Sequence, residues 1–68
     1  MTHPIITELR RIRKESRMSQ DAVAAALGKD STQITNYERG HQSPRISLIA
    51  DWADTLGYEL VLQPKVTT

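Results

Sequence analysis

The chain has 68 residues, no cysteine and a formal net charge of +1. This length suits one domain, residues 1–68, and the lack of cysteine excludes a disulfide framework and a thiolate metal site. No basic segment leads into an apolar one as in a signal peptide, and no apolar stretch reaches membrane-spanning length, so we expect a cytoplasmic protein with no membrane partner.

Basic residues concentrate near the N-terminus. Residues 1–17 contain five basic and two acidic side chains, whereas residues 18–68 contain four basic and six acidic ones. Positive charge gathered on one element steers a protein toward phosphates. A solvated helix face explains the same charges, so both interpretations remain open.

A first helix is predicted to begin at His3-Pro4, because proline is well accommodated at the first helical position. Ile5, Leu9 and Ile12 then recur at helical spacing and form an inward stripe. The opposite face carries basic side chains: Arg10, Arg11, Lys14 and Arg17.

Residues 19–40 predict two short helices joined by a turn. Ser19 can cap the first of them, and Gly28 ends it by permitting a positive φ. Asp30 caps the second, with Gln33 three residues later as in a capping box, and Gly40 closes it. The inward positions carry apolar or small side chains, as in a helix-turn-helix: Val23, Ala24, Leu27, Ile34 and Tyr37.

Residues 41–45 predict a loop, after which Ser43-Pro44 restarts a helix that ends at Gly57. The expected buried face of this fourth helix is apolar: Ile46, Ile49, Ala50, Ala53 and Leu56. Trp52 is expected to anchor either the core or an interface between subunits.

The segment from Tyr58 to Gln63 favours a β-strand, since it is short, rich in β-forming residues and stopped by Pro64. A lone apolar strand is prone to aggregate, so we expect it to pair with the same strand of a second subunit across a two-fold axis. The alternative is an extended tail packed on its own subunit. The expected dimer contacts are Tyr58, Leu60, Val61, Leu62 and Trp52.

This pattern resembles the Cro and repressor family of phage and bacterial regulators, which have a lambda repressor-like fold. The resemblance covers roughly residues 9–56 and rests on Gln20, Val23, Ala24, Leu27, Gly28, Ile34 and Tyr37, followed by Glu38-Arg39-Gly40. It implies an all-α domain of four helices, here with a C-terminal β-strand similar to those of Cro proteins and persistence-kinase antitoxins. It also implies that Arg13 pairs with Glu38 and locks the first helix to the third.

A helix-turn-helix inserts its second helix into the major groove, where side chains on the outer face reach base edges. The expected base-reading residues are Ser31, Thr32, Gln33 and Asn36. The resemblance and the charges place others on the DNA backbone: Gln20, Arg39, His41, Arg45, Arg11 and Lys14. The alternative is that these polar side chains merely keep an exposed helix face soluble, but the flanking motif already sets which face is outward.

No convergent set of acid, base or nucleophile groups indicates an enzyme, and neither histidine stands at metal-ligand spacing, so no metal or cofactor is expected. The leading hypothesis is a homodimeric repressor on a palindromic operator of double-stranded DNA. The alternative is an antitoxin that binds its own operator and a toxin, through a surface of Leu48, Trp52, Tyr58 and Val61. Co-purification of a second polypeptide would separate the two.

Overall fold

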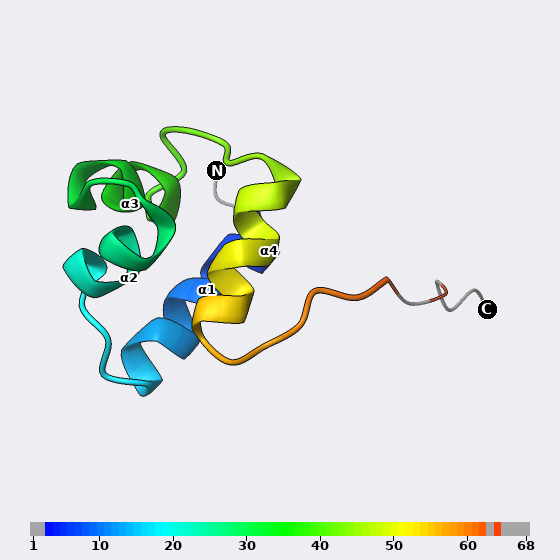
Figure 1. Cartoon of the computed structure of the whole chain (residues 1–68). Coiled ribbons are helices and arrows are strands. Elements are labelled where there is room, and N and C mark those ends of the chain that lie inside the picture. Colours follow the sequence, from blue (N-terminus) through cyan, green and yellow to red (C-terminus); the bar gives the residue numbers. More distant parts are fainter. Residues whose placement is uncertain (1–2, 63, 65–68) are drawn as a thin grey trace.

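The computed structural model describes residues 3–62 and residue 64. Within that part the chain forms four helices: α1 (Pro4–Glu15), α2 (Gln20–Leu27), α3 (Ser31–Glu38) and α4 (Ile46–Thr55). α2 packs against α3 and α4, and α1 also contacts both α3 and α4, so the four helices enclose one core (Figure 1). The prediction of an all-α, four-helix domain is confirmed.

The centre of the core is made of Val23, Ile34 and Trp52, one side chain from each of α2, α3 and α4. From α1 the buried apolar residues are Ile6, Leu9 and Ile12. Ile5 was predicted in this stripe, and Ile6 is the more deeply buried of the two, because Ile5 and Ile6 both border the stripe and spacing alone does not choose between them. Ile5 is half-buried and packs at the edge of the core.

The predicted helix ends are largely confirmed. Pro4 opens α1, and the preceding His3 caps it, since its Nδ1 accepts from the backbone N–H of Ile5 at 3.1 Å. The Ser19 hydroxyl accepts from the N–H of Ala22 at 3.0 Å and so caps α2. Gly28 follows α2 with a φ of 69°, the left-handed conformation for which glycine was expected.

The start of α4 differs from the prediction. The helix begins at Ile46, with Arg45 as its N-cap and Pro44 still in the loop. Ile46 shares a face with Ile49 but lies one turn earlier, past the core, and its side chain is 72% exposed. Ala53 of α4 and its C-cap Leu56 are buried as predicted, Trp52 is buried with them, and Ile49 packs against the core while partly exposed.

Trp52 belongs to the core. Its side chain has no exposed surface, and its ring lies 6.4 Å from that of Tyr37 at a tilt of 51°. Its assignment to a dimer interface was therefore wrong, because a side chain enclosed by its own subunit offers no surface to another.

The C-terminal segment shows no strand between residues 58 and 62, and Gln63, the last residue of the predicted strand, lies outside the described residues. Tyr58, Val61 and Leu62 are exposed, so the alternative of a tail packed on its own subunit is not observed either. Pairing with a second copy needs that copy and stays a prediction.

Candidate DNA interface

α3 is fixed at its N-terminus by the capping box predicted from the sequence. An Asp30 carboxylate oxygen accepts from the backbone N–H of Gln33 at 3.0 Å, and the Gln33 side-chain oxygen accepts from the N–H of Asp30 at 3.1 Å. The cap offsets the negative charge of Asp30 with helix amides. It also engages one lone pair of the Gln33 side-chain oxygen, so the amide N–H groups of this residue are its freest groups for a base edge.

The other expected base-reading residues lie on the same helix, and their side chains are at least partly exposed to solvent. Thr32 is exposed, and Ser31 and Asn36 are partly exposed. None of these three side chains hydrogen-bonds through its own polar group to a residue that the structure describes, and Ser31 takes part only through its backbone oxygen. Their hydroxyl and amide groups are thus available to an external donor or acceptor.

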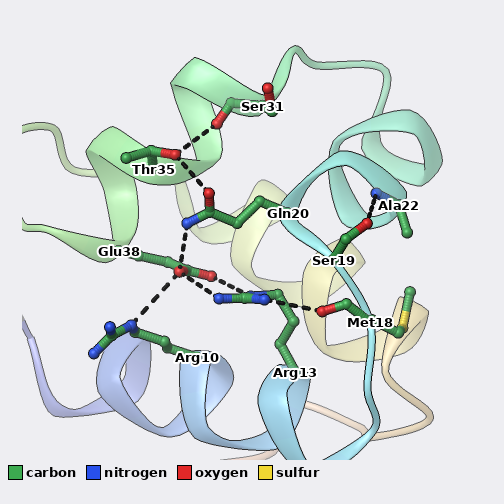
Figure 2. Close-up of polar contacts among 9 residues, drawn as sticks. All are labelled: Arg10, Arg13, Met18, Ser19, Gln20, Ala22, Ser31, Thr35 and Glu38. Atoms are coloured by element: carbon green, nitrogen blue, oxygen red, sulfur yellow. Dashed lines mark hydrogen bonds and ion pairs between the residues drawn. The ribbon is translucent and has the colours of Figure 1, made fainter.

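On its inner side, α3 is held by a buried ion pair. Arg13 of α1 donates from Nε and Nη2 to the two carboxylate oxygens of Glu38, at 2.7 and 3.0 Å. Its Nη1 donates to the backbone oxygen of Met18 at 2.9 Å (Figure 2). Both side chains are almost fully buried, so the pairing implied by the resemblance is confirmed. A two-pronged contact of this kind fixes orientation as well as distance.

Gln20 joins this pair to Thr35 in the middle of α3. Its Nε2 donates to Glu38 at 3.0 Å, and its Oε1 lies 2.8 Å from the hydroxyl of Thr35. That hydroxyl is also 3.0 Å from the backbone oxygen of Ser31, and its single proton serves one acceptor at a time (Figure 2). Gln20 was expected on the DNA backbone, and the structure shows both ends of its amide engaged within the subunit.

Thr35 and Arg10 were missed from the sequence. A threonine one position from Ile34 and Asn36 gives no spacing signal for its partner, which is Gln20 on another helix. Arg10 approaches Glu38 with its Nε at 3.7 Å while half of its side chain stays exposed. The Glu38 carboxylate therefore has two arginines beside it, and this corner of the molecule has an excess of positive charge.

The other residues that were expected to contact the DNA backbone differ in their surroundings. Arg39, His41 and Arg45 are exposed at the two ends of the α3–α4 loop, and Lys14 is exposed on α1. Arg11 is different, because it donates to both Glu8 and Glu15 on the same face of α1. Its hydrogen bond lowers the pKa of Glu8, and the two carboxylates raise the pKa of Arg11. Two acidic neighbours oppose the attraction of Arg11 for a phosphate.

The described part of the chain shows neither a metal site nor a membrane-spanning helix. Residues 3–62 and 64 contain no group of three histidine or carboxylate side chains placed to hold a metal ion. None of the helices described is long and apolar enough to cross a bilayer.

Comparison with known proteins agrees with this geometry. The sequence model of the helix-turn-helix family matches residues 9–63, which is most of the chain. The chain belongs to the helix-turn-helix family. A relative from Sinorhizobium fredii, an uncharacterized HTH-type transcriptional regulator named y4dL, is 36% identical over 64 residues. The alignment covers 94% of this chain and 33% of the relative, so the helix-turn-helix chain spans about a third of that protein's length.

Proposed function

We propose that this helix-turn-helix chain is a sequence-specific DNA-binding transcriptional regulator that inserts α3 into the major groove. The observation that carries the proposal is the contrast between the two sides of α3. Ile34 and Glu38 are buried on the inner side, while Thr32 and Asn36 keep free polar groups on the outer side. Asparagine can pair with adenine through two hydrogen bonds, and threonine offers a hydroxyl and a methyl to base edges.

Contacts to the DNA backbone are proposed for the exposed residues beside this helix. Arg39, His41 and Arg45 lie at the ends of the loop that follows α3, and Lys14 adds charge from α1. Gln20 and Arg11 remain in the proposal, with a smaller expected contribution to DNA binding. Gln20 already hydrogen-bonds to two residues of its own subunit, and Arg11 has two carboxylate neighbours.

In the proposed mode of action the regulator is a cytoplasmic homodimer that represses by occupying a palindromic operator. The support is the small size of the domain together with exposed apolar residues in the tail, Tyr58, Val61 and Leu62. A two-fold dimer presents two copies of α3 to half-sites about one helical turn apart, roughly 34 Å. The antitoxin alternative has less support. Trp52 was expected on the surface that would bind a toxin, but it is enclosed in the core.

Selection of bound sequences from a random pool of double-stranded DNA tests the proposal. We expect enrichment of a symmetric motif, and loss of preference at particular base positions when Asn36→Ala replaces the wild type. The Glu59→Ser variant, changed in the tail far from α3, serves as the control and should enrich the same motif as the wild type. Failure of the wild-type protein to enrich any motif contradicts the proposed function.

A further inference from the structure

A groove lies at the end of α4 nearest the α3–α4 loop, between the first turn of α1 and the start of α4. Its volume is about 320 Å³. The side chains that form its walls are mainly apolar: Ile5, Ile6, Tyr37, Pro44, Ile46 and Ile49. The described residues that line it include no lysine, arginine, aspartate or glutamate. The polar side chains on its lining are those of His3, Gln42 and Ser43, and a mainly apolar groove of this kind is suited to alkyl or aromatic groups rather than to phosphate.

The tail, residues 58–62, leaves α4 at the opposite end. Gly57 has a φ of 84°, and the N–H of Tyr58 donates to the backbone oxygen of Ala53 at 2.8 Å, so a helix-ending turn sets the direction of exit. From there the chain runs away from the four helices (Figure 1). Leu62 is 99% exposed, and Tyr58 and Val61 are more than half exposed. Each copy thus has an apolar groove at one end of α4 and an exposed apolar segment at the other.

We propose that the groove receives the tail of a second copy, with Leu62 as the inserted side chain. α4 has 10 residues and is about 15 Å long, so the tail begins that far from the groove of its own subunit and points away from it. A two-fold axis beside the middle of α4 reverses the helix in the second copy. Each tail then starts at the groove end of the other subunit, and two identical contacts form.

The two acidic residues of α4 lie outside the groove. Asp51 and Asp54 are exposed, yet neither lines the groove, so the inserted tail does not pass a buried carboxylate there. The inference rests on the proposed homodimer and names its contact. It also differs from strand pairing, because in this arrangement the two tails lie at opposite ends of the dimer and do not meet.

Sedimentation equilibrium without DNA tests the contact, using Leu62→Ser for the tail and Ile46→Ser for the groove. Both side chains are largely exposed in one subunit, so the helical circular dichroism of each variant should match that of the wild type. Burial of one leucine side chain is worth about tenfold or more in a binding constant, and the dimer has two such contacts. We therefore expect each variant to raise the dimer dissociation constant about 100-fold. Glu59→Ser, at a polar position of the same tail, should leave it unchanged.

A mixture of the two variants gives the decisive result. A mixed dimer has one intact contact, because the Ile46→Ser copy keeps its Leu62 and the Leu62→Ser copy keeps its groove. We expect the mixture to dimerise about tenfold more tightly than either variant alone. No gain on mixing contradicts insertion between subunits and favours a tail that folds into its own groove.

Two further outcomes overturn the inference. Normal dimerisation of Ile46→Ser indicates that the tails pair with one another as strands instead. A wild-type protein that stays monomeric indicates that the groove is empty or accepts an apolar segment of another protein. DNA selection on the same samples keeps the two hypotheses apart, since a monomer that still enriches a motif contradicts the inference and leaves the proposed function standing.

Discussion

The two sides of α3 carry similar polar groups that are used in different ways. On the inner side, Thr35 and Glu38 find their partners within the subunit, through Gln20 and Arg13. On the outer side, Thr32 and Asn36 keep free side-chain groups. Their position, rather than their residue type, decides their part in the molecule. The inner groups hold the helix at one angle, and the outer groups can exchange water for base edges once that angle is fixed.

The largest expected effect comes from breaking the inner side. Glu38→Ala removes the carboxylate and leaves Arg13 buried without an ion-pair partner, which costs about 3–5 kcal/mol in a folded protein. In a chain of 68 residues this is a large share of the total stability. We expect the unfolding midpoint in urea to fall sharply and DNA binding to be lost with the fold.

A double variant sharpens this prediction. Arg13→Met combined with Glu38→Leu removes both charges, so neither is left unpaired, and replacement of a whole buried pair by apolar side chains is often neutral. Urea unfolding should show that the double variant recovers most of the stability lost in Glu38→Ala. Equal losses in the single and double variants would mean that the pair itself, and not an orphaned charge, sets the cost.

The outer side should respond in binding and not in stability. Asn36→Ala or Thr32→Ala should weaken binding to the best DNA site by about 1–3 kcal/mol and relax preference at particular base pairs. Their thermal unfolding should match that of the wild type, because neither side chain is buried or bonded within the subunit. Titration against the selected motif and against single-base changes measures both effects. Lowered stability with intact base preference would reverse the assignment of the two sides.

Thr35→Val tests the inner side at the residue next to Asn36. Valine keeps the shape of threonine but cannot donate to Gln20 or to the oxygen of Ser31, and an unsatisfied buried group costs about 1–3 kcal/mol. Because the Gln20 oxygen and the Ser31 oxygen are only partly buried, we expect the free energy of unfolding in urea to fall by about 1 kcal/mol. DNA binding should weaken equally for all sequences. Thr35→Ser keeps the hydroxyl and serves as the control. A change in base preference for Thr35→Val alone would place Thr35 among the base-reading residues.

Local signals in the sequence were enough to predict the helix ends. Ser19, Gly28 and Asp30 act on residues three or four positions away, so their hydrogen bonds follow from spacing alone. The ion pair between Arg13 and Glu38 spans 25 positions, and only the family resemblance indicated it. Long-range partners of this kind depend on the angle between helices, which spacing does not give.

The errors have the same origin. Ile46 has the spacing of a buried residue, yet the core ends one turn short of it and leaves a groove there. Trp52 lies at the centre with Val23 of α2 and Ile34 of α3, and this position depends on how three helices pack together. Gln20 is not among these errors, since its contact with DNA stays a prediction, but its two bonds to Glu38 and Thr35 likewise appear only when α2 and α3 are in place.

The smallest expected effect compares two arginines at the edge of the proposed interface. Arg45 is exposed and forms no ion pair with any residue that the structure describes, whereas Arg11 lies between Glu8 and Glu15. Each phosphate neutralised by a protein contributes about 0.9 to the slope of log affinity against log salt. Arg45→Ala should flatten the slope by about that amount and weaken binding to all DNA sequences alike. Arg11→Ala should flatten it by less, since its charge is already opposed by two carboxylates. Equal changes for the two variants would show that DNA draws Arg11 away from its acidic neighbours, and an unchanged slope for Arg45→Ala would remove that residue from the DNA backbone.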